Sequence, residues 1–222
     1  IGFSGFQEMK INLSQQLAAD DYFEIYEIHP NDSIHELCEK VFDTAVSEIL
    51  NVRSQIDQKI LEQAIQTLAK ASRVEFYAFG GSAPVAMDGQ HKFFRLQIPS
   101  SCISDPHIQF MSANSLNKDD VVVAISQSGT TSALVDSVKT VRESGVKVIG
   151  IMPGNTPLAK VCDFSLTINV GSNDRLTMPL TSRLAYTAVI DVLTMGVAQL
   201  KPEAQDHLYN IADSQRSLKI DN

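Results

Sequence analysis

Apolar residues in the first third of the chain repeat every three or four positions, which is the spacing of one face of an α-helix. Runs of this kind cover residues 6 to 19, 31 to 56 and 56 to 71. Asp32 or Ser33, at the start of the second run, can cap the helix, because both side chains accept hydrogen bonds from the first helical amides. The pattern predicts three helices before any strand.

The period changes after residue 73, where short runs rich in β-branched or aromatic residues begin. These runs predict strands at 74 to 79, 95 to 103, 121 to 126, 146 to 151 and 164 to 169. Helical patterns lie between and after them, at about 83 to 93, 106 to 113, 131 to 144, 156 to 161, 178 to 199 and 203 to 217. Runs such as VVVAIS are apolar throughout, which is typical of strands covered on both faces. The alternation predicts an α/β fold: a five-stranded parallel sheet flanked by helices, with an N-terminal helical extension.

Composition and charge narrow the class of protein. The chain has 222 residues, which suits one large domain or one domain with an extension. Lys and Arg number 18 against 26 Asp and Glu, and the net charge of −8 gives no basic surface to neutralise nucleic-acid phosphates. The sequence shows neither an apolar run of about 20 residues nor a signal-peptide pattern. We therefore expect a cytoplasmic protein that by itself does not hold DNA.

Several residues of types that can bind metals, form disulfides or contact ligands are interpreted as structural. The three cysteines are Cys38, Cys102 and Cys162. Their wide spacing argues against a disulfide framework and a zinc cluster, so we expect them to be reduced, buried and inert. Met9, Phe42 and Met195 stand at helical spacing and are expected in the core. His29, His35 and His207 show no metal-ligand spacing, and we expect neither a metal nor a cofactor.

The turn after the third predicted strand is the strongest candidate for a binding site. In an open parallel sheet, ligands bind at the carboxyl ends of the strands, where the strand order reverses. Four hydroxyl residues crowd onto this turn next to a helix start: Ser126, Ser128, Thr130 and Thr131. Backbone amides and the helix dipole favour an anion there, and Gly129 would let the backbone approach it closely. Without Lys or Arg the turn suits a single phosphate monoester, unless its hydroxyls merely cap the helix.

The first predicted strand leads into a second turn of similar character. Gly80 and Gly81 permit a tight bend, and Pro84 fits the first turn of a helix. Ser82 is expected to face the same edge of the sheet as the hydroxyl-rich turn. The dinucleotide pattern G-x-G-x-x-G is missing, and no acidic residue ends the second strand to bind a ribose. A Rossmann dehydrogenase is therefore disfavoured.

The two turns, FGGSAPVAMD and ISQSGTTSALVDS, together resemble the sugar isomerase (SIS) domain, whose signature turn reads roughly I-S-x-S-G-x-T. Residues 72 to 200 fit that domain through all five strands, which implies a flavodoxin-like three-layer sandwich. SIS domains bind phosphosugars through the hydroxyls and amides of these turns. The resemblance implies phosphate ligands at Ser82, Ser126, Ser128 and Thr131, supported by Gly81, Gln127, Gly129 and Thr130.

The first residues resemble the end of the DNA-binding domain in SIS regulators of RpiR type, where a helix-turn-helix precedes the SIS domain. The chain starts with Ile, so we expect a fragment in which residues 1 to 30 are the connector and residues 31 to 222 the phosphosugar-binding domain. SAPVAMDGQHKFFRL and KDDVVVAISQSGTT are similar to the hexose-catabolism repressors of that family, which respond to 2-keto-3-deoxy-6-phosphogluconate. This implies a homo-dimeric or tetrameric sensor that contacts DNA only through the missing domain and has no membrane partner.

A sugar-phosphate isomerase is the alternative function. Aldose-ketose isomerisation needs a base, usually Glu or His with a pKa near neutral. His107 follows the second predicted strand and could touch the sugar end of a ligand or simply be solvated; Asp88 is less well placed. Neither turn contains Glu, which favours a sensor without turnover. A purely structural oligomerisation module would leave the hydroxyls unexplained.

Three other side chains, in the predicted helices that follow the first and the last strand, have both a structural and a functional interpretation. His91 and Lys92 are interpreted as packing or dimer contacts. Arg183 could reach an acidic ligand or a subunit partner, and we favour a structural role.

Overall fold

Helices precede and then alternate with strands in the computed structural model, which describes residues 28–169, 182–204 and 207. The strands are β1 (Val74–Ala78), β2 (Ser100–Ile103), β3 (Val121–Ile125), β4 (Lys147–Met152) and β5 (Phe164–Thr167). The helices are α2 (Ile34–Gln55), α3 (Gln58–Ala69), the 3-10 turn η1 (Gly80–Ser82), α4 (Ala83–Arg95), α5 (Pro106–Ala113), α6 (Ser132–Glu143), α7 (Pro157–Val161) and α8 (Ser182–Leu200).

The strands form one parallel sheet in the order β2-β1-β3-β4-β5, which confirms the predicted α/β fold. The chain order reverses between β1 and β3, which pair along their whole length from Val74 opposite Val121 to Ala78 opposite Ile125. Every residue of both strands is buried, as expected for strands covered by helices on both faces. The reversal sets the carboxyl ends of these two strands side by side.

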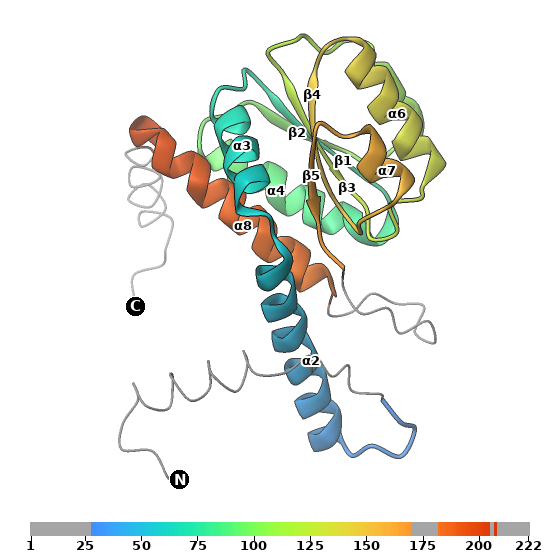
Figure 1. Ribbon diagram of the computed structural model, residues 1–222. Coiled ribbons are helices and arrows are strands. Elements are labelled where there is room, and N and C mark those ends of the chain that lie inside the picture. The colour runs from blue at the N-terminus through green and yellow to red at the C-terminus, as the bar shows by residue number, and fades with distance from the viewer. Residues whose placement is uncertain (1–27, 170–181, 205–206, 208–222) are drawn as a thin grey trace, which may run out of the picture.

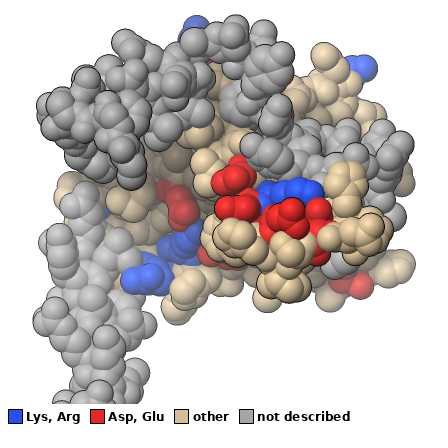
Figure 2. Space-filling model, turned by 90° about the horizontal axis from the view of Figure 1, so that it is seen from below, with Lys and Arg blue, Asp and Glu red and all other residues tan. Residues whose placement is uncertain are grey.

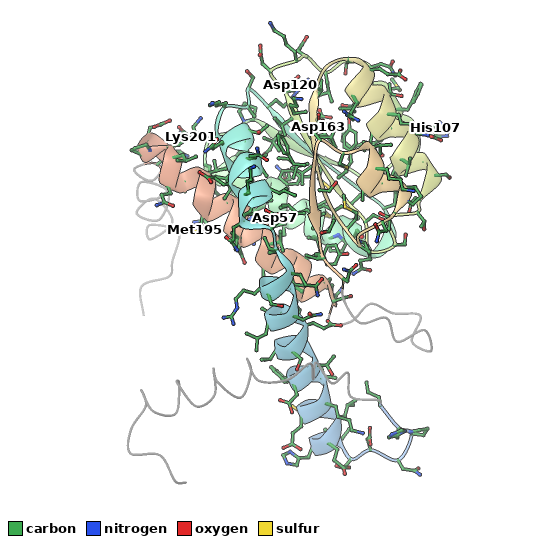
Figure 3. The ribbon with its side chains drawn as sticks, in the orientation of Figure 1. Asp57, His107, Asp120, Asp163, Met195 and Lys201 are labelled. Carbon is green, nitrogen blue, oxygen red and sulfur yellow. The ribbon has the colours of Figure 1, made fainter. Side chains whose placement is uncertain are left out.

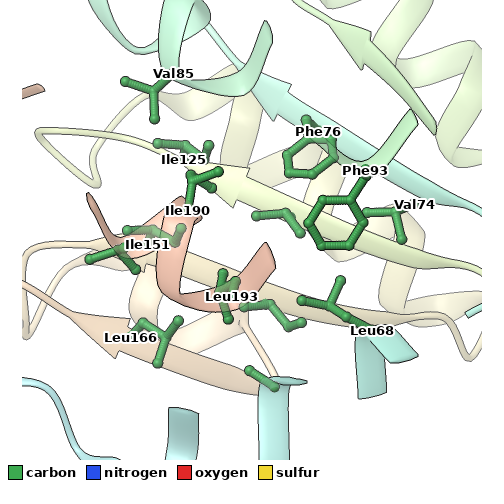
Figure 4. Packing of buried hydrophobic residues seen from close by; sticks show 14 of the residues in the cluster. Leu68, Val74, Phe76, Val85, Phe93, Ile125, Ile151, Leu166, Ile190 and Leu193 are labelled. Carbon is green, nitrogen blue, oxygen red and sulfur yellow. The ribbon is translucent and has the colours of Figure 1, made fainter. Parts of the chain in front are cut away.

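Two hydrophobic cores lie on the two faces of the sheet. Helices α3, α4 and α8 cover one face, and α5, α6 and α7 the other (Figure 1). Neighbouring residues of β1 point to opposite sides, so that Phe76 belongs to the first core and Tyr77 to the second. In the first core the ring of Phe93 meets that of Phe76 edge to face, at 5.4 Å between centroids (Figure 4). This contact fixes α4 on the sheet.

Helix α2 extends away from the sheet (Figure 1). It begins with a capping box in which the Ser33 hydroxyl accepts a hydrogen bond from the Glu36 amide and the Glu36 carboxylate accepts one from the Ser33 amide. Its buried residues, Thr44, Ala45, Glu48 and Val52, all lie between its middle and its C-terminal end. Phe42 is 67% exposed, so its prediction as a core residue is wrong. The apolar stripe of α2 continues beyond the part of the helix whose residues are buried.

Other expectations about single residues need correction. Met195, on the outer side of α8, is exposed rather than in the core (Figure 3), whereas Met9 lies outside the described residues. Cys38 is exposed on α2, and Cys102 and Cys162 are half-buried. The cysteines were therefore predicted correctly only in being unpaired.

The strand expected over residues 95 to 103 is shorter, because Arg95 still belongs to α4 and β2 starts at Ser100. Leu96 and Ile98 are buried in the first core, with Gln97 between them in a left-handed turn at φ 58°. These two apolar side chains therefore anchor a turn and do not belong to a strand. The other predicted strands match within two residues.

Some predicted helices cannot be compared with the structure. The helix at 6 to 19, the start of the one at 178 to 199 and most of the one at 203 to 217 lie outside the described residues. Within the described ranges, no helix is both long and apolar enough to cross a bilayer.

Candidate functional site

The two predicted turns lie next to each other at the carboxyl edge of the sheet. Ala78 and Ile125, the last residues of β1 and β3, are paired across the strand-order reversal. The η1 turn with Ser82 follows the first of these strands, and the turn formed by residues 126–131 follows the second. We call the latter the hydroxyl turn. The sheet topology thus brings together the residues that the sequence places more than 40 positions apart.

The hydroxyl turn is folded around the side chain of Ser126. Ser126 is buried, and its amide donates to the carbonyl of Ile151 on β4 at 3.0 Å. Its hydroxyl accepts a hydrogen bond from the Gly129 amide at 2.9 Å, and the Ser128 hydroxyl accepts one from the Thr130 amide at 3.3 Å. Two backbone amides that could donate to an anion, those of Gly129 and Thr130, therefore already donate hydrogen bonds within the turn.

Gly129 occupies a position that only glycine fits. Its φ is +63°, in the left-handed region that other residues rarely adopt, and a Cβ there would lie 2.3 Å from the Thr156 hydroxyl oxygen. Its carbonyl accepts a hydrogen bond from the Leu158 amide in α7 at 3.0 Å. The hydroxyl turn is therefore packed directly against the turn that joins β4 to α7.

The starts of α4 and α6, which follow the two strands at the strand-order reversal, differ from the other described helix starts in the use of their N-cap side chains. Ser33, Asp57, Asp105 and Thr156 each accept a capping hydrogen bond from the helix that follows. Ser82 and Thr131 are the N-caps of α4 and α6, yet neither side chain accepts such a bond. The alternative interpretation of the hydroxyl-rich turn, that its hydroxyls merely cap the helix, is therefore wrong for Thr131. Both hydroxyls lie at helix N-termini, where the dipole favours an anion.

Helix α8 contributes two residues to this region that the sequence analysis missed. The Gln127 side chain donates to the Ser182 hydroxyl at 3.2 Å, and the Tyr186 hydroxyl donates to the Ser126 carbonyl at 3.5 Å. Tyr186 is fully buried, and burial raises the pKa of its phenol. A buried tyrosine in an apolar helix needs a hydrogen-bond partner for its hydroxyl. This requirement could have identified Tyr186 from the sequence.

His107, the candidate base, is exposed in the first turn of α5, which follows the edge strand β2. Its amide donates to the Asp105 carboxylate at 2.9 Å, and Figure 3 shows its side chain at the periphery of the molecule. Asp88 forms an ion pair with Lys92, which also reaches Asp191 on α8 at 2.6 Å. Lys92 thus links α4 to α8, in agreement with its interpretation as a packing residue.

Neither turn supplies a cation to an anionic ligand. Residues 79 to 84 and 126 to 132 contain no Lys or Arg, and Arg183 is exposed one residue after Ser182. Seen from below, acidic and basic side chains lie interspersed rather than forming a continuous basic surface (Figure 2). In the described part of the chain, no group of three or more His, Cys, Asp or Glu side chains could hold a metal ion. Hydroxyls, amides and helix dipoles are therefore the groups that these turns offer to an anion.

Comparison with known proteins agrees with this geometry. Residues 67–196 match the family model described as SIS domain. The chain is 33% identical over 214 residues to the "HTH-type transcriptional regulator HexR" of Pseudomonas aeruginosa, covering 96% of this chain and 75% of that protein. It is 32% identical to the protein of the same name in Escherichia coli, covering 98% of this chain and 75% of that protein.

A solved structure shares the fold as well. The Vibrio vulnificus NanR protein complexed with ManNAc-6P matches with a TM-score of 0.77 and 20% sequence identity, covering 99% of this chain and 78% of that one. The chain therefore belongs to the SIS-domain family, and its relatives place it with the HexR-type transcriptional regulators.

Proposed function

We propose that the chain is the effector-binding part of a transcriptional regulator that senses a phosphorylated sugar or sugar acid. The phosphate is held between η1 and the hydroxyl turn. Binding alters DNA binding by a helix-turn-helix domain that precedes residue 1, with residues 1 to 30 as its connector and residues 31 to 222 as the sensor. The names of the HexR relatives and the phosphosugar in the NanR complex support this assignment.

One observation carries the proposal. Two hydroxyl residues at the starts of α4 and α6, Ser82 and Thr131, do not use their side chains for capping. Ser82 is the last residue of η1 and has helical backbone angles, whereas Thr131 has the extended backbone of an N-cap. A phosphate dianion accepts hydrogen bonds from hydroxyls and backbone amides, and helix N-termini favour its charge. Ser126 and Ser128 supply two more hydroxyls in the same turn. The resemblance to hexose-catabolism repressors makes 2-keto-3-deoxy-6-phosphogluconate the first ligand to test.

We also propose that the sensor works as a homo-dimer or tetramer. Helices α4 and α8 lie side by side and carry exposed apolar side chains on their outer surfaces: Met87, Phe94, Leu184, Val192 and Met195. Exposed apolar surface of this kind favours self-association. The ion pair between Lys92 and Asp191 lies between the two helices.

Replacing the hydroxyls of the turn tests the phosphate site. We expect Ser126→Ala and Ser128→Ala each to weaken binding of 2-keto-3-deoxy-6-phosphogluconate by roughly ten- to a hundredfold, because each removes a charge-assisted hydrogen bond of about 1.5 to 3 kcal/mol. Calorimetric titration measures the affinity. Ser144→Ala, at the far end of α6, is the matched control and should bind normally. The same sugar acid without its phosphate should not bind, and full affinity in both turn variants would place the phosphate elsewhere.

An assay for turnover separates the sensor from an isomerase. We expect no interconversion of aldose and ketose phosphates above background, because His107 is exposed on α5 and Asp88 is ion-paired. Ligand should still raise the melting temperature, since binding at a hundredfold excess over Kd stabilises the fold by about 2.7 kcal/mol. Turnover that disappears in His107→Ala but persists in His91→Ala, which removes another exposed histidine, would show that the protein is an isomerase.

A further inference from the structure

Helix α2 is joined to the carboxyl edge of the sheet through Asn169, which follows β5. The carbonyl of Asn169 accepts hydrogen bonds from the side-chain amides of Asn51 and Gln55, both at 3.1 Å. Its amide donates to the Gln55 side-chain oxygen at 3.0 Å. The Gln55 amide also donates to the Asn51 side chain at 2.6 Å. We call these three residues the α2 clamp.

The α2 clamp is connected in turn to the β4–α7 turn. The side-chain oxygen of Asn169 accepts a hydrogen bond from the Gly154 amide at 3.1 Å. Gly154 lies two residues before Thr156, which caps α7. Thr156 also accounts for the tight contact with Gly129 of the hydroxyl turn, and the Gly129 carbonyl bonds Leu158. Contacts and hydrogen bonds therefore run without a gap from the hydroxyl turn to α2.

An anion in the hydroxyl turn has to compete for groups that already bond each other. The Gly129 amide now donates to Ser126, and the Thr130 amide donates to Ser128. A phosphate that takes these donors must break or share the internal bonds. The backbone of Gly129 then shifts relative to Ser126. Because the Gly129 carbonyl accepts a hydrogen bond from the Leu158 amide in α7, a shift of Gly129 is passed on to the start of α7 and to the β4–α7 turn that precedes it.

We propose that the α2 clamp couples occupancy of the hydroxyl turn to the position of α2. The proposal rests on the proposed function for its ligand, and it adds the route by which binding reaches the N-terminal side of the chain. Asn51 and Gln55 are positioning residues in this scheme, since neither lies in the two turns. The buried residues of α2 lie in the part of the helix that packs on α8. This packing keeps α2 folded on the domain, and the clamp only sets its position.

Spin labels can report the position of α2. One label goes on Cys38, which is exposed on α2, and the other on Lys118→Cys in the turn before β3, at the opposite edge of the sheet. Cys102 and Cys162 are both half-buried and are replaced by alanine in every labelled chain, so that only the two chosen positions react. Labelled chain is diluted with unlabelled chain so that distances within one protomer are measured.

The first arm of the experiment needs no ligand. Ser126→Ala removes the bond to the Gly129 amide, and we expect it to shift the distance between the labels. In the Asn51→Ala, Gln55→Ala background the same substitution should cause no further shift, as a double-mutant cycle for coupled sites requires. Gln63→Ala with Gln66→Ala, which removes two exposed side-chain amides from α3, is the matched control and should leave the shift intact.

The second arm adds saturating 2-keto-3-deoxy-6-phosphogluconate, with binding followed by calorimetry. We expect the probe to shift the distance in the unsubstituted and control chains, and the shift to be lost in the Asn51→Ala, Gln55→Ala variant although it still binds. A full shift in that variant, or bound probe without any shift in the unsubstituted chain, would overturn the coupling. If the probe does not bind but Ser126→Ala moves α2 through the clamp, the coupling stands and the proposed ligand is wrong.

Discussion

Gly129→Ala is expected to lower the free energy of unfolding by about 2 to 5 kcal/mol and to abolish phosphosugar binding. A left-handed φ costs a residue with a Cβ roughly 1 to 2 kcal/mol, and overpacking against a fixed neighbour adds about 1 to 3 kcal/mol. Gly129 has φ +63°, and its Cβ would lie within 2.3 to 2.7 Å of three side-chain atoms of Thr156. Relief of that clash requires the hydroxyl turn to move away from α7.

Gly145 offers a matched control for this substitution. Its φ is +79°, but no atom lies within 4 Å of the Cβ that alanine would add. Gly145→Ala should therefore cost only the conformational part, roughly 1 to 2 kcal/mol, and should leave binding unchanged. Urea denaturation of both variants and calorimetric titration make the comparison. Equal losses of stability in the two variants would show that contact with Thr156 does not constrain the turn.

Phe93→Ala is expected to destabilise the fold by about 3 to 5 kcal/mol, the usual cost of removing a fully buried aromatic ring. Phe93 is 0% exposed and packs edge to face on Phe76, the middle residue of β1, the strand that leads into the site. The cavity would loosen α4, whose N-cap is Ser82. We therefore expect weaker ligand binding as well as a lower melting temperature.

The next residue gives the control. Phe94 is 64% exposed, and Phe94→Ala in the monomer should change stability by no more than about 0.5 kcal/mol. Urea denaturation at several protein concentrations tests both variants. A concentration-dependent effect of Phe94→Ala would indicate that α4 lies in a subunit interface. A loss of less than about 1 kcal/mol for Phe93→Ala would contradict the packing described for the first core.

The sequence predicted the sheet and the two turns well because their signals are local. A strand, a glycine-containing turn and a helix start follow each other within a few residues, and parallel topology then brings the carboxyl ends together. The sequence could not show that the side chains of Ser82 and Thr131 make no capping hydrogen bond. Whether a hydroxyl reaches a backbone amide depends on distances in the folded chain, which no residue pattern encodes.

Expectations failed where tertiary contacts decide the outcome. The stripe on α2 identifies an apolar face but not which part of it is covered, so that Phe42 was assigned to the core. Leu96 and Ile98 were read as a strand because buried turn anchors and strand residues have the same composition. The contacts of Asn169 with α2 join residues more than 110 positions apart, so no local sequence pattern could predict them.

The strand order also has a consequence for synthesis on the ribosome. Helix α3 packs on β5 and α8, elements that are made about 90 or more residues later. The apolar face of α3 therefore emerges long before the surface that will bury it, while β1 must wait for β3 before its second edge is paired. Domains whose contacts are this distant in sequence fold slowly and expose apolar surface meanwhile. We therefore expect the apolar face of α3 to stay exposed on the nascent chain until α8, the last helix of the described core, has left the ribosome.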